Sequence, residues 1–334
     1  MPPPKREEAD MQSWFLKAGE RDATLELREA AVPEPASGQL LLRMRAAALD
    51  RGEFIVGHGL SKAGSAKPAG MEGAGEVAKA GAGTSGFAPG DRVMGRCAGA
   101  FSEYALIDAR EAMHVPANLS WEEAASIPLA FLVVHDMLVL QGRLRAGEWL
   151  LVTGVSSGVG VAALQAAKAL GAKVIGTSGS AEKLARLGPL GLDVPLATRA
   201  PDFRDAVLRA TDGRGADLVV NTVGGSVFAE CVRSMAFEGR LAVVGYVDHV
   251  LAAQIDLQAV HAKRLTLFGV SNKLRSAEQR AAAVPAFVRD LLPFFARGTI
   301  RPLVDSVHPF AGLPAARERM ESNRHTGKIV LAIA

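Results

Sequence analysis

One stretch of sequence decides the fold of this chain: Trp149-Leu150-Leu151-Val152-Thr153-Gly154-Val155-Ser156-Ser157-Gly158-Val159-Gly160-Val161-Ala162-Ala163-Leu164-Gln165. A short apolar run ends in a cluster of small residues, and a helix-period pattern follows directly, which predicts a strand, a tight turn and a helix. Further on, Lys173-Val174-Ile175-Gly176-Thr177 predicts a second strand. Together these segments form a βαβ unit of the expected size.

The turn of this unit is suited to a diphosphate. Small residues let the backbone approach a ligand, and the helix N-terminus offers N–H groups and the positive end of its dipole. The G-x-G-x-x-G pattern is imperfect, because Val155 and Ser157 stand at the first two glycine positions and only Gly160 remains. The alternative is a purely structural turn. We predict that the diphosphate-binding residues are Ser156, Ser157, Gly158, Val159 and Gly160.

Composition excludes several classes of protein. The chain has 334 residues, 49% apolar and 22% charged, which is typical of a globular protein with one large or two ordinary domains. A net charge of +3 without a basic block implies neither nucleic acid nor a membrane surface as partner. The longest apolar run, 127–134, is too short to cross a bilayer, and the N-terminus lacks a signal-peptide pattern. Two cysteines, Cys97 and Cys231, suit a reducing cytosol, so we expect a cytoplasmic protein.

The pattern along the chain predicts two domains. From Met11 to about Trp121, short strands alternate with Gly- and Pro-containing turns, which indicates an all-β barrel-like region. Strand and helix patterns then alternate, which indicates a parallel, doubly wound sheet. We expect residues 123–270 to form this α/β domain, and residues 1–122 to form the β domain, completed by 271–334. The expected elements are helices at 122–127, 130–140 and 281–297 and strands at 149–153, 174–177, 191–196, 217–221, 240–245, 265–269 and 328–333.

Several motifs occur in a characteristic order. They are Gly70-Met71-Glu72-Gly73-Ala74-Gly75-Glu76-Val77, Pro89-Gly90-Asp91-Arg92-Val93-Met94-Gly95, the turn above, Asp217-Leu218-Val219-Val220-Asn221-Thr222-Val223-Gly224-Gly225 and Gly327-Lys328-Ile329-Val330-Leu331. With them the chain resembles the medium-chain dehydrogenase/reductase superfamily and, within it, the zinc-free quinone oxidoreductase branch. The resemblance extends from Leu40 to the C-terminus. It implies an α/β fold in which a Rossmann-type doubly wound parallel sheet is joined to a GroES-like β-barrel catalytic domain.

The end of the second strand predicts which nicotinamide cofactor binds. NAD enzymes of this fold place an acid there, whereas this chain has Thr177-Ser178-Gly179-Ser180-Ala181-Glu182-Lys183, with no acid at the strand end. Ser178, Ser180 and Lys183 could bind the 2′-phosphate of NADP(H), and a Ser and a Lys do so in the enzymes that the chain resembles. Lys183 could instead be a solvated lysine on a helix face. A tyrosine of those enzymes corresponds to Thr198, with the neighbouring Arg199 as a substitute and Arg324 as a second candidate. We therefore predict NADP(H) rather than NAD(H).

The other strand ends should complete the cofactor crevice, since ligands lie at the carboxyl ends of parallel strands. The candidates there are Asn221, Gly245 and Tyr246. The resemblance implies that backbone groups near Phe268 and Val270 hold the nicotinamide amide. Packing alone is the alternative for these two residues.

The resemblance also implies that no metal is bound. Zinc-dependent members need a Cys, a His and a Cys or Asp around the metal. Here the first ligand position is Asp50, the histidine position is Met71, and the proton-relay hydroxyl is replaced by Gly52. The four-cysteine lobe is absent as well. An alcohol would be a poor substrate without a Lewis acid.

Hydride transfer without a metal suits an acceptor that is already electrophilic, such as a quinone or an α,β-unsaturated carbonyl. Enoyl-thioester reductases of the superfamily carry a tyrosine shortly after the position of Asp50. The loop 54–60 has none, although its His58 could donate a proton. The candidate catalytic residues are Asp50, His58 and His135, with Glu53 also near the cleft, and each could instead have a structural role.

We therefore expect an NADPH-dependent, zinc-independent reductase that transfers hydride to a quinone or an α,β-unsaturated carbonyl, with a small hydrophobic substrate. One alternative is a cofactor-binding protein with little catalysis, such as a redox sensor or a structural partner. Another is an enoyl-thioester reductase or an alcohol dehydrogenase-type enzyme. The resemblance further implies a homodimer, for which the segment 264–270 is the candidate edge strand.

Overall fold

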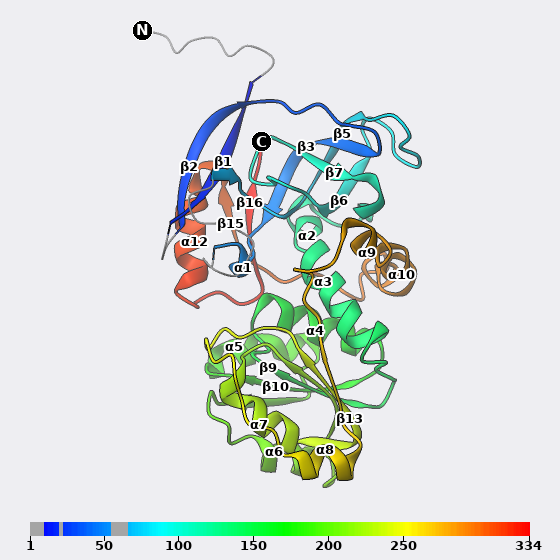
Figure 1. Cartoon of the computed structure of the whole chain (residues 1–334), viewed down its shortest axis with the longest axis vertical. Helices are drawn as coiled ribbons and strands as arrows, with labels where there is room; N and C mark the ends of the chain where they lie inside the picture. Colours follow the sequence, from blue (N-terminus) through cyan, green and yellow to red (C-terminus); the bar gives the residue numbers. More distant parts are fainter. Residues whose placement is uncertain (1–9, 20–22, 55–65) are drawn as a thin grey trace. The chain divides into compact units, whose positions relative to one another are not determined.

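Strands dominate the first third of the chain, and alternating strands and helices follow (Figure 1). The computed structural model describes residues 10–19, 23–54 and 66–334. The chain divides into two units. The first unit comprises Met1–Leu129, Arg275–Asp290 and Val304–Ala334, and the second comprises Ala130–Leu274 and Leu291–Leu303.

The first unit contains two sheets. A seven-stranded sheet has the order β15-β16-β3-β5-β6-β8, with β7 paired to β3, and a three-stranded sheet has the order β2-β1-β4. The C-terminal strand β16 lies antiparallel to β3, so the end of the chain returns to the first unit as expected. The strands are β1 (Asp10–Ala18), β2 (Ala23–Ala31), β3 (Gln39–Ala48), β4 (Ala66–Pro68), β5 (Glu72–Ala80), β6 (Arg92–Arg96), β7 (Tyr104–Asp108), β8 (Ala112–His114), β15 (Val304–Pro309) and β16 (Lys328–Ala332).

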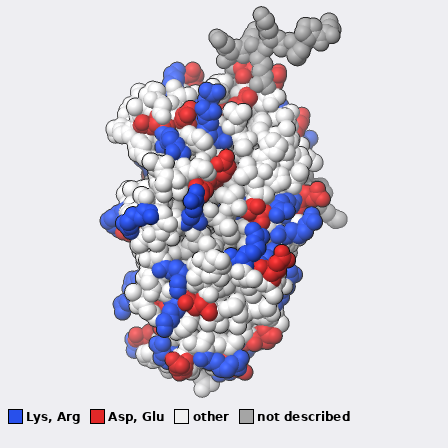
Figure 2. Space-filling model, turned by 180° about the vertical axis from the view of Figure 1, so that it is seen from behind, with Lys and Arg blue, Asp and Glu red and all other residues white. Residues whose placement is uncertain are grey.

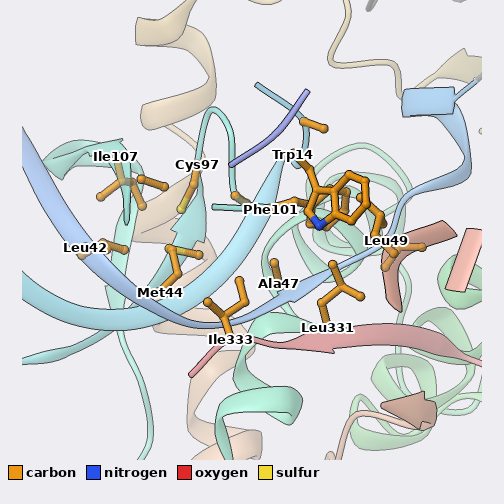
Figure 3. Close-up of a cluster of buried hydrophobic side chains, with 14 of the residues drawn as sticks. Trp14, Leu42, Met44, Ala47, Leu49, Cys97, Phe101, Ile107, Leu331 and Ile333 are labelled. Carbon is orange, nitrogen blue, oxygen red and sulfur yellow. The ribbon is translucent and has the colours of Figure 1, made fainter. Parts of the chain in front are cut away.

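One apolar core holds these two sheets together. Figure 3 shows side chains from distant parts of the sequence pointing toward one another, among them Trp14, Leu42, Phe101 and Leu331. All four are buried. Removing such side chains from water is the main favourable term in folding. The helices of this unit are α1 (Arg51–Phe54), α2 (Trp121–Ala125), α9 (Ala277–Ala281), α10 (Val284–Asp290) and α12 (Leu313–Glu321), with short 3₁₀ turns at Ala109–Glu111 and Phe310–Gly312.

The second unit is built on a six-stranded parallel sheet of order β11-β10-β9-β12-β13-β14. The strands are β9 (Trp149–Thr153), β10 (Lys173–Ser178), β11 (Val194–Ala197), β12 (Ala216–Asn221), β13 (Met235–Val243) and β14 (Thr266–Gly269). The helices are α4 (Gly158–Ala169), α5 (Ala181–Leu187), α6 (Arg204–Ala210), α7 (Gly225–Arg233), α8 (Leu257–Lys263) and α11 (Leu292–Ala296), while α3 (Pro128–His135) begins in the first unit. This confirms the expected parallel sheet. The strand β14 lies at one edge of this sheet. It falls within 264–270, the segment predicted to pair with a second copy of the chain, and that pairing stays a prediction.

Several expected elements differ in extent. The strand expected at 240–245 is β13, which begins at Met235 and ends at Val243. The expected strand 191–196 begins only at Val194, because Gly191 has a φ of 89° and ends a 3₁₀ turn. The expected helix 130–140 is α3 followed by a π-helix at Asp136–Leu140. The expected helix 281–297 is divided into α10 and α11, and Pro293 lies in the first turn of α11, where its missing N–H costs least.

The segment Leu291–Leu303 groups with the second unit, although we expected it to complete the first. The ring of Phe295 packs edge-on against that of Phe131, with 4.8 Å between the centroids. The backbone N–H of Arg301 donates to the side-chain oxygen of Gln165 in α4 over 3.0 Å. These contacts lie within the second unit.

Charges of both signs are interleaved on the face shown in Figure 2. None of the helices among the described residues combines the length and the apolar character that a membrane span requires.

Candidate functional site

The turn between β9 and α4 has the geometry of an anion-binding helix N-terminus. Ser157 has extended backbone angles and caps α4, and its Oγ accepts the N–H of Gly160 over 3.1 Å. Gly154 has a φ of 67°, which glycine adopts at no steric cost. A Cβ on Gly160 would lie 2.5 Å from the carbonyl oxygen of Gly154. The small residues therefore let the first turn of α4 lie directly on the strand end. Its N–H groups stay available to a phosphate.

The second strand end adjoins this turn. The Oγ of Ser156 lies 3.1 Å from the Oγ of Ser178, which is buried at the end of β10. Ser180 caps α5, and its Oγ accepts the N–H of Lys183 over 3.3 Å. The structure thus brings Ser156, Ser178 and Ser180 close together, and their contact with a 2′-phosphate stays a prediction.

Arg199 lies against the same loop. A Cβ built on Gly179 would meet the Nε of Arg199 at 1.9 Å and two carbons of the same side chain at 2.5 and 2.6 Å. The arginine therefore crosses the glycine between Ser178 and Ser180, and only a glycine leaves room for it. The neighbouring Thr198 is engaged elsewhere, since its hydroxyl donates to Asp202 over 2.7 Å.

Asn221 shapes its own loop. Its side chain is buried, and its Oδ1 accepts the N–H groups of Val223 and Gly224 over 3.0 and 3.1 Å. Its Nδ2 donates to the carbonyl oxygen of Gly224 over 2.9 Å. This is the usual behaviour of an asparagine that forms a turn with its own backbone. A direct contact with the cofactor stays a prediction.

The remaining cofactor candidates are spread over both units. Gly245 and the exposed Tyr246 follow β13, Phe268 lies in β14, and Val270 is buried just after it. Arg324 belongs to the first unit, where its Nε donates to Ser322 Oγ over 3.2 Å. Their roles in cofactor binding stay predictions.

A buried ionic group lies in the first unit at the end of β3. It consists of Asp50, Glu53, Glu72 and Lys328, here called the acid–lysine cluster. The topology explains why they meet. Ala47 of β3 pairs with Gly73 of β5, and Ala48 pairs with Val330 of β16, so Glu72 and Lys328 flank the end of β3 from either side.

Lys328 is the centre of this cluster. Its Nζ donates to Asp50 Oδ1 over 2.9 Å and to the carbonyl oxygen of Leu49 over 3.0 Å. The same nitrogen lies 2.6 Å from Glu72 Oε1, an ion-pair contact that is not aligned as a hydrogen bond. Glu72 Oε2 accepts the N–H of Leu129 at the start of α3 over 2.7 Å. The ammonium is therefore held by two carboxyl groups and a carbonyl, away from water.

Burial favours the protonated form of two of the acids. It raises the pKa of Glu72 to about 8, against the effect of the nearby Lys328 ammonium, and the charge of Asp50 adds to the increase. Burial also raises the pKa of Glu53 to about 7, against the hydrogen bond that its Oε1 accepts from the Gly70 N–H over 2.5 Å. Burial acts to lower the pKa of Lys328, but the contacts with Asp50 and Glu72 outweigh it and raise this pKa above its usual value, so the ammonium stays charged.

We expect Glu53→Gln to change how stability depends on pH. A carboxyl whose pKa is higher in the folded than in the unfolded state costs stability as the pH rises between the two values. For Glu53 these are about 7 and 4.5, and an amide can still accept from Gly70. The stability of the variant relative to wild type should grow by roughly 3 kcal/mol from about pH 4 to about pH 8, as urea unfolding would measure. The exposed Glu34→Gln serves as control, and parallel curves for Glu53→Gln would contradict the prediction.

The cluster does not fit a zinc ion. The expected ligand position holds Asp50, whose Oδ1 binds an ammonium, and the histidine position holds Met71. The carboxylate oxygens that a divalent cation would need here already contact the ammonium of Lys328, at 2.9 Å for Asp50 and 2.6 Å for Glu72. Among the residues that the structure describes, no group of three His, Cys, Asp or Glu side chains could hold a metal. Cys97 is buried, which raises the pKa of its thiol to about 12.

The roles of the other two predicted catalytic residues stay predictions. His135 is buried at the junction of α3 and the π-helix and belongs to the second unit. His58 lies outside the described residues. The sequence reasoning named Asp50 and Glu53 but not the side chains of Glu72 and Lys328. A signal was present, because each is a charged residue at the first position of a strand and is followed directly by small or apolar residues.

Two family profiles match the chain. The profile described as "Alcohol dehydrogenase GroES-like domain" matches residues 36–117, and that described as "Zinc-binding dehydrogenase" matches 158–287. The expected α/β fold with a Rossmann-type sheet and a GroES-like domain is confirmed.

The curated relatives include a protein of similar length and much longer polyketide synthases. Over 335 residues the chain is 29% identical to an acryloyl-coenzyme A reductase of Metallosphaera sedula, with 92% of this chain and 96% of the relative covered. Over 251 residues it is 31% identical to the highly reducing polyketide synthase easB of Emericella nidulans, with 74% of this chain but 10% of the relative covered. The chain thus spans about a tenth of the first polyketide synthases that it matches.

Solved structures match along nearly the whole chain. A protein described as an NAD-dependent alcohol dehydrogenase is 30% identical with a TM-score of 0.82, covering 97% of this chain and all of its own. A mycobacterial protein complexed with NADPH is 26% identical with a TM-score of 0.84, covering 96% of this chain and 99% of its own.

Proposed function

The chain belongs to the medium-chain dehydrogenase/reductase superfamily, and we propose that it is an NADPH-dependent, zinc-independent reductase of double bonds conjugated to a carbonyl group. Quinones are a second acceptor class with the same electronic character. It is thus an oxidoreductase of this superfamily, and the cofactor and acceptor are the proposed part.

The observation that carries the acceptor class is the ammonium of Lys328 between Asp50 and Glu72. A Lewis acid that would acidify an alcohol has no fitting ligand set there. The acceptor must therefore be electrophilic on its own, as an α,β-unsaturated carbonyl or a quinone is. Protein groups then contribute orientation and exclusion of water.

The loops of the second unit support the choice of NADPH. A bound nicotinamide nucleotide supplies the hydride. The N-terminus of α4, capped by Ser157, would hold the diphosphate. Ser178, Ser180 and Arg199 would hold the 2′-phosphate, because a guanidinium beside two hydroxyls offers charge-assisted hydrogen bonds. No carboxylate follows the end of β10 directly to repel that phosphate.

Among the curated relatives a conjugated double bond has more support than a quinone, while one solved structure of similar fold is described as a quinone oxidoreductase. One relative of matching length is named for the reduction of acryloyl-coenzyme A, so the enoyl-thioester alternative stands beside simpler enones and enals. Enoyl-thioester reductases of the superfamily carry a tyrosine in the loop that corresponds to 54–60, and this chain has none there. If it reduces a conjugated double bond, the proton must therefore come from another group. A cofactor-binding protein with little catalysis would bind NADPH without turning over any of these acceptors.

A single acceptor panel tests the proposal. NADPH oxidation is followed with an alkenal, an enoyl thioester, a 1,4-quinone and a primary alcohol plus NADP⁺. We expect turnover with the conjugated acceptors and none with the alcohol. Tight NADPH binding without turnover on any acceptor would favour the non-catalytic alternative.

Arg199→Ala should change cofactor preference. Removing one charge-assisted contact to the 2′-phosphate should lower kcat/KM for NADPH by roughly 10- to 100-fold, with little change for NADH. Arg186→Ala, in α5 of the same unit, is the matched arginine control. Equal losses with both cofactors would show that Arg199 serves the fold rather than the phosphate.

A further inference from the structure

The chain that follows β13 turns back onto the start of α7. This segment, 244–250, is here called the β13 loop. The N–H of Asp248 donates to the carbonyl oxygen of Val223 over 3.0 Å, and the N–H of Gly225 donates to that of Val250 over 3.0 Å. All of these residues belong to the second unit. Two backbone hydrogen bonds thus join the β13 loop to the chain between β12 and α7.

The side chain of Asp248 strengthens this contact. Its Oδ2 accepts the N–H and the hydroxyl of Ser226 over 2.8 and 2.5 Å, and its Oδ1 accepts the N–H of Val250 over 2.9 Å. Burial acts to raise the pKa of this carboxyl, but the hydrogen bonds outweigh it and hold the pKa below its usual value. The carboxylate is therefore ionised at neutral pH. It lies at the first turn of α7, where N–H groups lack partners within the helix and the helix dipole favours negative charge.

This contact also explains the two glycines that end the motif 217–225. Gly224 has a φ of 130°, which side-chain-bearing residues rarely adopt. A Cβ on Gly224 would collide with Oδ1 of Asp248, and a Cβ on Gly225 would lie 2.7 Å from the carbonyl oxygen of Val250. Only glycines at both positions let the β13 loop reach α7.

The β13 loop lies at the carboxyl end of the parallel sheet, where ligands of doubly wound folds bind. In the sheet order, β12 and β13 lie on the opposite side of β9 from β10. A dinucleotide with its 2′-phosphate at the end of β10 and its diphosphate at the end of β9 must therefore extend its nicotinamide toward β12 and β13. Gly245, the second residue of the β13 loop, is close to the first of these strands, since a Cβ on it would lie 3.5 Å from the carbonyl oxygen of Thr222.

We propose that Asp248 is a positioning residue for the nicotinamide half of the cofactor. Its carboxylate ties the β13 loop to the start of α7 and so fixes the backbone of Gly245 and Tyr246 beside the nicotinamide. A loop that is ordered before the cofactor arrives costs less entropy to bind. The proposal rests on the proposed function, which supplies the cofactor.

An asparagine cannot replace this aspartate. The groups that point at the carboxylate, from Ser226 and Val250, are all donors, and an amide would turn its NH₂ toward at least one of them. Asp256 provides the matched control on the chain that follows. Its Oδ1 accepts only the N–H of Ala259 over 2.9 Å, as the N-cap of α8, and asparagine caps a helix equally well.

Calorimetry with two ligands tests the proposal. One ligand is NADPH, and the other is adenosine 2′,5′-bisphosphate, which has the 2′-phosphate and one phosphate of the diphosphate but no nicotinamide. We expect Asp248→Asn to weaken NADPH binding by about 10-fold and to change binding of the fragment by less than about twofold. Ser226→Ala, which removes one donor and keeps the carboxylate, should weaken NADPH binding by about threefold. Asp256→Asn should bind both ligands as wild type does.

Binding of the fragment separates positioning from a general structural role. Equal weakening of both ligands in Asp248→Asn, or unchanged NADPH binding, would overturn the positioning role. If Asp248→Asn does not fold, the same comparison in Ser226→Ala decides. If wild type binds neither ligand, the proposed NADPH site is wrong, and the role of Asp248 fails with it. If wild type binds both and the variants do not distinguish them, only the role of Asp248 is wrong.

Discussion

Replacing Lys328 with methionine should lower the free energy of unfolding by about 3–5 kcal/mol. The ammonium is buried and contacts Asp50, Glu72 and the Leu49 carbonyl within 3.0 Å. Methionine fills a similar volume but leaves the two acids without their cation. Removing one member of a buried ion pair is costly because the remaining charge stays out of water.

Urea unfolding measures this loss of stability. Two further variants test whether the loss comes from the buried, unpaired acids. Lys79→Met breaks the exposed pair with Glu34 and should cost less than about 1 kcal/mol. The triple variant Lys328→Met, Asp50→Asn, Glu72→Gln should recover most of the loss, since no uncompensated charge remains. A Lys328→Met cost as small as that of Lys79→Met would mean that the acids take up protons and need no ammonium.

The parallel sheet could be predicted because its signals are local. The apolar run 149–153, the small residues after it and the helical period of 158–169 are adjacent in sequence, and the structure forms β9, the turn and α4 from them. The extent of helices was harder to predict. The helical period continues through Leu291 and Leu292, but the chain changes units there.

The acid–lysine cluster could not be assembled from the sequence. Asp50 and Lys328 are 278 residues apart, and only the pairing of β16 and β5 on either side of β3 brings them together. The sequence shows the motifs that contain Glu72 and Lys328. It does not show that their side chains contact each other or Asp50. The position of Arg199 could be predicted from the sequence. Thr198 stands where the related enzymes have a tyrosine, which made the neighbouring Arg199 a candidate, and the structure places the Arg199 side chain against Gly179.

The second large effect is expected at Gly160. A Cβ there would lie 2.5 Å from the Gly154 carbonyl oxygen and 2.7 Å from both the Cα and the carbonyl oxygen of Val155. These are backbone atoms, which cannot rotate away as a side chain can. Gly160→Ala must therefore move the start of α4 away from the end of β9. The N–H groups at the N-terminus of α4 would then no longer point at the diphosphate.

Loss of about two charge-assisted hydrogen bonds corresponds to roughly 3 kcal/mol, so NADPH should bind about 100-fold more weakly to Gly160→Ala. Isothermal titration calorimetry measures this directly, without reference to any acceptor. The matched control is Gly188→Ala, since nothing lies within 4 Å of a Cβ at that position and its backbone is helical. Because NADH carries the same diphosphate, its affinity should fall with that of NADPH in Gly160→Ala, in contrast to Arg199→Ala. Unchanged binding of both cofactors would mean that the diphosphate does not lie on the N-terminus of α4.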